Sequence, residues 1–161
     1  MKKIRQFLLL ALTLTSTEQL FAQVSPVKFS DIEGLQQKEK RVVMVIIGTE
    51  WCKYCNSIKQ SVLKDRKLTA TLGKSFYTIF LNAEYKHDIS FAGRTFKYKP
   101  TGVNTGAHEL ADELGTIDKQ LTFPSLCFLN EKNEIIYQHA GYIDPISLAT
   151  LLKKLSGQLN L

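Results

Sequence analysis

Two cysteines three positions apart are the residues of this chain best suited to covalent chemistry. Cys52 and Cys55 enclose Lys53 and Tyr54 in the stretch GTEWCKYC, directly after an apolar run. Residues i and i+3 in the first turn of a helix lie close enough for a disulfide to join them. Unpaired N–H groups and the dipole at a helix start stabilise a thiolate. We therefore expect Cys52 to be an exposed nucleophile and Cys55 to be more buried and to resolve a mixed disulfide.

A metal site and a purely structural disulfide are the other interpretations of this pair. A zinc site usually has a second cysteine pair or two closely spaced histidines, and here only Cys127, His87, His108 and His139 remain, all isolated. A disulfide that closes so short a loop constrains the unfolded chain little, so it adds little stability. The spacing therefore favours redox chemistry, with no metal and no bound cofactor.

Hydrophobic periodicity predicts the elements that position the cysteine pair. Residues 41–47 are rich in β-branched types and indicate a strand buried on both faces, ended by Gly48. A helical pattern begins at the second cysteine, runs through about residue 64 and continues for another turn or two toward Gly73. Further strands are predicted at 75–83, 123–130 and 135–139, and further helices at 31–39, 106–114 and 144–155.

The order of these elements predicts the fold class. A strand–helix–strand unit is followed by a helix, a hairpin that turns at residues 131–134, and a last helix. This order favours an α/β fold with a mixed sheet and helices on both of its faces. Ser30 and Glu33 have the spacing of a capping box at the start of the first helix.

The first 22 residues have the layout of a secretory signal peptide. A basic start that includes Lys2 and Arg5 precedes the apolar stretch 7–14, and Leu20-Phe21-Ala22 is a suitable cleavage site. The apolar stretch is well short of the roughly 18 residues of a membrane-spanning helix; a retained N-terminal anchor is the alternative. We predict cleavage after Ala22, a periplasmic or secreted product, and no stable membrane insertion of that product.

The remaining residues, 23–161, have the size of one domain with a single core, and we expect a monomer. The whole chain has 21 basic and 15 acidic residues, and removal of residues 1–22 lowers the net charge from +6 to +4. The basic residues are scattered and do not alternate with aromatic ones, so no nucleic-acid partner is expected.

Three features of the sequence resemble proteins of the thioredoxin fold, in particular the exported bacterial thioredoxin-like members. Trp51-Cys52-Lys53-Tyr54-Cys55 matches the W-C-x-x-C motif at a strand-to-helix junction. Thr122-Phe123-Pro124-Ser125 matches the cis-proline loop, and Gly141 matches the glycine before the last helix. The resemblance covers about residues 30–158. It implies a central mixed sheet of four to five strands.

The resemblance also implies an activity and a substrate surface. Cys52 and Cys55 would be the catalytic, redox-active pair of a thiol–disulfide oxidoreductase that acts on protein thiols and disulfides and is reset by an unidentified redox partner. Pro124 would lie against the pair, and the Phe123 backbone would bind an extended substrate segment. Trp51 and Tyr54 would complete the substrate-binding surface.

The sequence departs from the family at two places. Ile46 stands where thioredoxins usually carry a buried aspartate, and Lys53-Tyr54 replaces the usual Gly-Pro. These differences leave reductase, oxidase and isomerase activity open, because the dipeptide and the thiolate environment set the redox potential. The alternative function is a binding module on the same scaffold. It would be either a copper metallochaperone that uses Cys52, Cys55 and a nearby histidine, or an adaptor.

Four further features receive structural predictions. Cys127 lies in an apolar strand, so we expect it in the core. Glu50 and His108 are expected to be solvated. The irregular insertion at about residues 84–105 contains a small hairpin that turns at Gly93-Arg94, and it either extends the binding surface or packs on its own aromatic residues.

Overall fold

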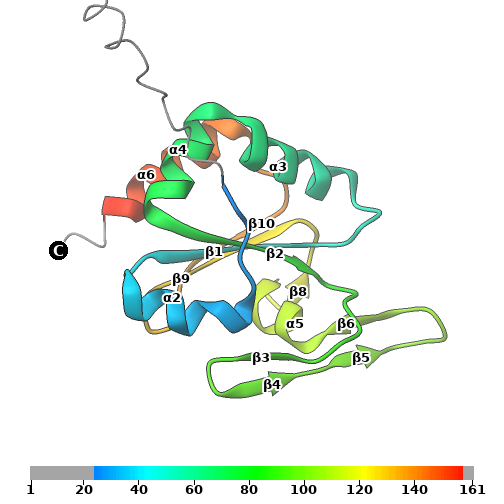
Figure 1. Cartoon of the computed structure of the whole chain (residues 1–161). Helices are drawn as coiled ribbons and strands as arrows, with labels where there is room; N and C mark the ends of the chain where they lie inside the picture. The colour runs from blue at the N-terminus through cyan, green and yellow to red at the C-terminus, as the bar shows by residue number, and fades with distance from the viewer. Residues whose placement is uncertain (1–23, 158–161) are drawn as a thin grey trace, which may run out of the picture.

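A four-stranded mixed sheet forms the centre of the computed structural model, which describes residues 24–157. The strand order is β10-β9-β1-β2 (Figure 1). β1 pairs in parallel with β2 and antiparallel with β9, and β9 pairs antiparallel with β10, which confirms the predicted mixed sheet. The strands are β1 (Val42–Gly48), β2 (Phe76–Asn82), β9 (Ser125–Leu129) and β10 (Ile135–Ala140).

Helices cover both faces of this sheet, as predicted (Figure 1). α3, α4 and α6 pack on one face, and α2 and α5 on the other. Every residue of β1 is therefore buried, and its side chains alternate between the two cores. The helical elements are η1 (Phe29–Asp31), α2 (Ile32–Lys38), α3 (Lys53–Lys64), α4 (Arg66–Ser75), α5 (Glu109–Gly115) and α6 (Pro145–Gly157).

Two helix boundaries near the start of the chain and after the cysteine pair differ from the prediction. The 3-10 turn η1 precedes α2, so Asp31 occupies the N-cap position of α2 and the predicted cap at Ser30 is wrong. The helical pattern after the cysteine pair forms two helices, because the Asp65 side chain accepts from the backbone N–H groups of Lys67 and Leu68 and starts α4.

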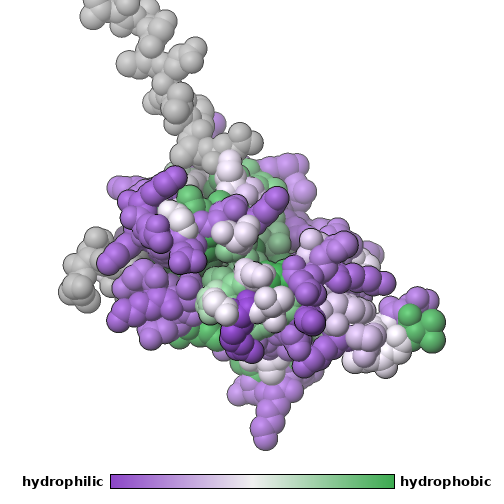
Figure 2. All heavy atoms as spheres, turned by 60° about the horizontal axis from the view of Figure 1, so that its bottom comes forward, coloured by the Kyte–Doolittle hydropathy of each residue, from purple (hydrophilic) through white to green (hydrophobic). Residues whose placement is uncertain are grey.

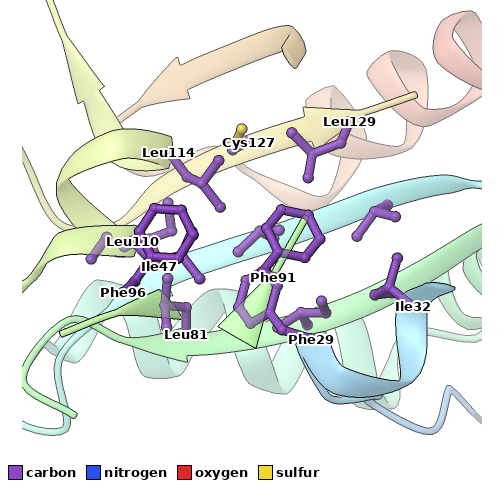
Figure 3. Packing of buried hydrophobic residues seen from close by; sticks show 14 of the residues in the cluster. Phe29, Ile32, Ile47, Leu81, Phe91, Phe96, Leu110, Leu114, Cys127 and Leu129 are labelled. Carbon is purple, nitrogen blue, oxygen red and sulfur yellow. The ribbon is translucent and has the colours of Figure 1, made fainter. Parts of the chain in front are cut away.

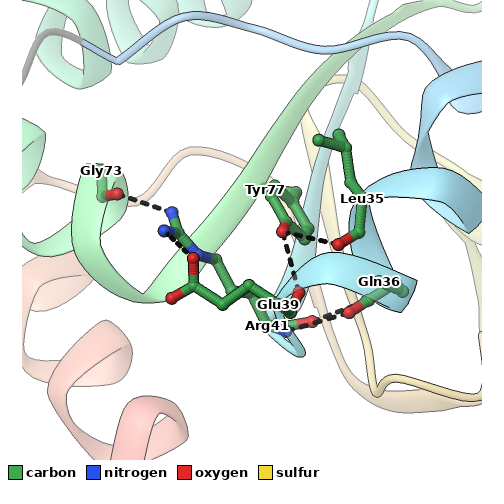
Figure 4. A network of polar contacts seen from close by, with 6 residues as sticks. All are labelled: Leu35, Gln36, Glu39, Arg41, Gly73 and Tyr77. Carbon is green, nitrogen blue, oxygen red and sulfur yellow. Dashed lines mark hydrogen bonds and ion pairs between the residues drawn. The ribbon is translucent and has the colours of Figure 1, made fainter.

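A polar network joins α2, β2 and α4 where the chain enters the sheet (Figure 4). The Tyr77 hydroxyl donates to the carbonyls of Leu35 and Glu39. Arg41 donates to the carbonyl of Gly73 at 2.7 Å and pairs with the Glu39 carboxylate. These contacts satisfy the carbonyl groups at the ends of two helices and hold the start of β1 in place.

The first half of the insertion belongs to the core. β3 (Ile89–Phe91) and β4 (Arg94–Phe96) form an antiparallel hairpin whose turn residues, Ala92 and Gly93, have positive φ. The predicted hairpin is thus confirmed, with its turn one residue earlier. Phe91 and Phe96 are buried, and the Phe91 ring lies 4.9 Å from that of Phe29 (Figure 3). These aromatic residues therefore fill the core on the α2 and α5 face.

The second half of the insertion forms a hairpin that the sequence analysis missed. β5 (Tyr98–Pro100) pairs antiparallel with β6 (Gly106–His108), so the helix predicted at 106–114 begins only at Glu109. A side chain at Gly106 would collide with Tyr98, which explains the glycine there. The short pair β7 (Thr116–Ile117) and β8 (Gln120–Leu121) follows α5.

Figure 2 shows mainly hydrophilic side chains on the face of the molecule that includes the insertion hairpins β3–β4 and β5–β6. Val103, in the loop between β5 and β6, is fully exposed. Across residues 24–157, no helix has the length and hydropathy needed to cross a bilayer. The predicted signal peptide lies outside the described residues.

Candidate active site

Cys52 and Cys55 form a disulfide at the start of α3. Their Cα atoms are 5.2 Å apart and their sulfur atoms 2.12 Å apart. Cys52 is the N-cap residue of α3, and its Sγ accepts the backbone N–H of Cys55 at 3.1 Å. The same N–H group and the positive end of the helix dipole would stabilise a Cys52 thiolate after reduction.

Burial differs between the two cysteines. Cys55 is completely buried, whereas Cys52 keeps 7% of its surface accessible. The predicted order of accessibility is confirmed, but Cys52 is not an exposed residue in the disulfide form. Its sulfur is bonded to Cys55 and lies over the backbone of the first turn of α3, which leaves little of it in contact with solvent.

Gly48, the last residue of β1, lies directly against Cys55. A Cβ atom at Gly48 would be 2.5 Å from the Cys55 Sγ and 2.8 Å from its Cβ, closer than real atoms approach. Only glycine therefore fits between the end of β1 and the second cysteine. Gly48 was predicted only to end a strand, because its contact with Cys55 depends on how α3 packs on β1.

The cis-proline loop lies at the same end of the sheet as the cysteine pair. The peptide bond between Phe123 and Pro124 is cis, as predicted. Ile47 pairs with Ser125, so the loop before β9 lies beside the segment that follows β1. No hydrogen bond within the described part of the chain uses the Phe123 backbone, so its N–H and C=O groups remain available.

Two exposed aromatic residues flank the cysteines. Trp51 is 70% exposed, and its indole Nε1 donates to the Glu84 carboxylate at 3.2 Å. Tyr54 is 64% exposed, and its ring lies 5.6 Å from that of Tyr142. The sequence analysis named neither Glu84 nor Tyr142, since each reaches its partner from a distant part of the chain.

Two backbone hydrogen bonds connect the ends of the insertion to Gly48, the residue that contacts Cys55. Ala83 N–H donates to the Gly48 carbonyl, and His108 N–H donates to the Ala83 carbonyl, both at 2.7 Å. The residues that bracket the insertion therefore connect it to the strand end that contacts Cys55.

His108 is completely buried, which corrects the expectation that it is solvated. Its Nδ1 accepts the backbone N–H of Leu110 and caps α5, so the ring proton lies on Nε2, which donates to the His87 carbonyl at 3.2 Å. The ring joins the start of α5 to the insertion.

The position of the family's buried aspartate is apolar here. Ile46 is completely buried and packs in the core on the α3, α4 and α6 face. Glu50 is exposed, as predicted, and accepts only a long hydrogen bond of 3.5 Å from the Asn82 side chain. The hydroxyls of Thr49 and Thr122 are buried and have no partner among the described residues.

Cys127 is a free, fully buried cysteine in the core that α2 and α5 cover (Figure 3), as predicted. Desolvation by burial raises the pKa of its thiol to about 12. The thiol therefore stays protonated at neutral pH and cannot act as a nucleophile there.

Within residues 24–157, no cluster of three or more His, Cys, Asp or Glu side chains could hold a metal ion. The three histidines lie on different elements: His87 is in the insertion, His108 caps α5 and His139 is in β10.

The thioredoxin-like class of proteins is defined by a mixed sheet with a Cys-x-x-Cys disulfide at a strand-to-helix junction and an adjacent cis-proline loop. This structure has all three features. The chain belongs to this family: the family model described as a thioredoxin-like domain matches residues 29–156.

Solved structures share this fold at low sequence identity. A thioredoxin-fold protein from Helicobacter pylori aligns with a TM-score of 0.58 and 15% identity over 91% of this chain and 83% of its own. The DsbH oxidoreductase aligns with a TM-score of 0.59 and 15% identity over 92% and 93% of the two chains. A disulphide isomerase from Xylella fastidiosa Temecula1 aligns at 0.54 and 15% over 90% and 98%. No curated protein sequence matches this chain.

Proposed function

We propose that this protein is an exported thiol–disulfide oxidoreductase that acts on protein disulfides. The observation that carries the proposal is the Cys52–Cys55 disulfide, held at the start of α3 beside the cis-proline loop. Two proteins of similar fold are described as an oxidoreductase and a disulphide isomerase, which supports the same class of chemistry.

The reaction proceeds by two thiol–disulfide exchanges. In the reducing direction, the Cys52 thiolate attacks one sulfur of the client disulfide, forms a mixed disulfide and releases the other client sulfur as a thiolate. The Cys55 thiolate then attacks Cys52 Sγ, closes the Cys52–Cys55 disulfide and releases the second client thiol. Two electrons pass from the enzyme dithiol to the client, and oxidation of a client reverses both steps.

The client is held by the groups around the cysteine pair. The free N–H and C=O groups of Phe123 pair with the backbone of an extended client segment, which is recognition by strand addition. Pro124 forms the loop that presents them, and the exposed rings of Trp51 and Tyr54 cover side chains of the client.

The equilibrium reduction potential of the cysteine pair tests this function. We expect a reversible two-electron transition between about −270 and −120 mV, measured in glutathione and dithiothreitol buffers; its position decides between a reductase and an oxidant or isomerase. The Cys52→Ser variant should lose disulfide exchange with insulin, and Cys55→Ser should stop at the mixed disulfide and lose catalytic turnover. Cys127→Ser should keep the wild-type activity.

A pair that stays oxidised below about −300 mV would contradict an enzymatic role and mark a structural disulfide. Stoichiometric copper binding by the reduced protein without disulfide exchange would favour the metallochaperone. Partner binding that survives Cys52→Ser and Cys55→Ser would favour the adaptor.

Export is proposed from the signal-peptide layout of residues 1–22, and the contacts of Val24 and Val27 are compatible with a cut after Ala22. Val24 is buried in the core with α3, α4 and α6, and Val27 N–H donates to the Thr78 carbonyl along the edge of β2. A cut after Ala22 keeps both contacts. The intact mass of the protein isolated from the periplasm or the medium should equal that of a chain that starts at Gln23. A full-length, membrane-bound product would instead indicate a retained anchor.

A further inference from the structure

A groove between β10 and α6 is not used by the proposed chemistry. Its volume is about 630 Å³, within the range of small-molecule and side-chain binding sites. The groove is named here the β10–α6 groove. Its apolar and aromatic lining residues are Tyr137, Tyr142, Ile143, Ile146 and Leu151, and its polar ones include His139, Asp144 and Lys154.

Much of the apolar surface in this groove lies open to solvent. Ile146, in the first turn of α6, is 80% exposed, whereas Leu148, two residues further along the same helix, is buried on its opposite side. Tyr137 and Tyr142 are also exposed. β10 is an edge strand of the sheet, so no neighbouring strand covers this side. The free energy of the system falls when another apolar group covers such a surface and removes it from water.

The groove continues directly from the candidate active site. Tyr142 belongs to the groove wall, and its ring contacts the ring of Tyr54 inside the Cys-x-x-Cys motif, with 5.6 Å between ring centroids. One residue earlier, Gly141 N–H donates to the Pro124 carbonyl at 2.8 Å. The turn after β10 therefore touches both the cysteine helix and the cis-proline loop.

This continuity identifies the occupant. A second copy of the chain seated on Tyr142 would crowd Tyr54 and hinder access to the disulfide, whereas a client held at the disulfide already lies beside the groove. A polypeptide segment bonded to Cys52 can extend a neighbouring side chain past Tyr142 toward Ile146. Two charged side chains line the groove, Asp144 and Lys154. The Asp144 carboxylate already accepts the backbone N–H groups of Ile146 and Ser147 at the start of α6. The aromatic and aliphatic side chains of the lining leave mainly apolar surface for a ligand, so a bulky apolar side chain matches the groove best.

We propose that the β10–α6 groove is a specificity subsite that binds a bulky apolar side chain close in sequence to the reacting cysteine of a polypeptide client. This inference rests on the proposed function and adds the class of client to it. The enzyme should therefore prefer disulfides that are flanked by residues such as Leu or Phe.

The test uses two short synthetic peptides, each joined to its own copy by one disulfide. One peptide has Leu at the second and third residues on both sides of the cysteine, and the other has Ser there. The mature reduced protein is mixed with each, and the second-order rate constant of exchange is measured. We expect the Leu peptide to react at least about fivefold faster, and the preference to fall close to one in Ile146→Ser and in Tyr142→Ser.

Val103→Ser is the matched control, because Val103 is fully exposed on the β5–β6 loop outside the groove. It should keep the wild-type preference. Circular dichroism checks that each variant is folded. Ile146→Ser is expected to fold normally, because the Ile146 side chain is largely in solvent. The Tyr142→Ser variant tests the groove independently.

Bis(2-hydroxyethyl) disulfide is the third substrate. It has no side chain that could occupy the groove, so it reports disulfide exchange alone and distinguishes failure of the subsite from failure of the proposed function. Wild-type protein that reacts with none of the three disulfides would contradict the oxidoreductase itself. Wild-type protein that reacts with all three and shows no Leu preference, or a preference that persists in both groove variants, would overturn the subsite alone. A wild-type dimer that dissociates in Ile146→Ser would assign the groove to a second copy instead.

Discussion

At the scale of single residues, the contact between Gly48 and Cys55 sets the strictest steric limit in the site. Replacement of Gly48 by Ala would place a Cβ atom 2.5 Å from the Cys55 Sγ, and Cys55 is fully buried with no room to move. We expect Gly48→Ala to lower the free energy of unfolding by about 1–3 kcal/mol, as overpacking of a core does. Because the clash involves the sulfur itself, the reduction potential of the pair should also change.

Gly34→Ala is the matched control for that substitution. Gly34 lies in α2 and has nothing within 4 Å of an added Cβ atom, so alanine there should stabilise the helix by about 0.5–1 kcal/mol. Its reduction potential should equal that of the wild type. A Gly48→Ala protein with wild-type stability and potential would show that Cys55 relaxes without cost, contrary to the packing seen here.

At the scale of secondary-structure elements, His108 connects α5 to the insertion. The ring accepts from Leu110 N–H and donates to the His87 carbonyl while completely buried. We expect His108→Ala to lower the free energy of unfolding in urea by about 1–3 kcal/mol, because it removes a helix cap and leaves buried groups unpaired. His108→Asn keeps an acceptor for Leu110 and should lose less.

The neighbouring histidine provides the control for this prediction. His87 uses its backbone carbonyl in the contact, and its side chain is exposed. His87→Ala should therefore change stability by no more than about 0.5 kcal/mol. Equal losses for the alanine variants at positions 87 and 108 would show that the buried ring is not what holds the two elements together.

At the scale of the whole molecule, one sheet serves two cores. Val45 points into the core with α2 and α5, and Ile46 points into the core with α3, α4 and α6. Neither core is complete without β1, so we expect the molecule to unfold in one cooperative transition. Far-UV circular dichroism and the fluorescence of Trp51 should give the same midpoint in urea.

Substitutions in either core test this coupling. Val45→Ala in one core and Ile58→Ala in the other should each lower the free energy of unfolding, Ile58→Ala by about 2–5 kcal/mol and Val45→Ala by somewhat less, with one transition retained. Different midpoints for the two optical probes would indicate that the two faces of the sheet unfold separately.

Sequence patterns predicted the elements whose signal is local. The apolar run before the cysteines, the turn at residues 131–134 and the last helix predicted at 144–155 each depend on neighbouring residues alone, and all three appear in the structure. The helix expected at 106–114 was partly wrong, because residues 106–108 pair with a strand eight positions earlier. Pairing of that kind depends on partners that a local pattern does not contain.

The chemistry of the site divides in the same way. The spacing of Cys52 and Cys55 at a strand-to-helix junction was enough to predict a disulfide, since three residues of one helix turn set their separation. The proximity of Gly48 to Cys55, of Glu84 to Trp51 and of Tyr142 to Tyr54 joins segments that are distant in the chain. Only the packing of α3, β2 and the β10–α6 turn brings them together, so local spacing determined the reactive pair and tertiary structure decided what surrounds it.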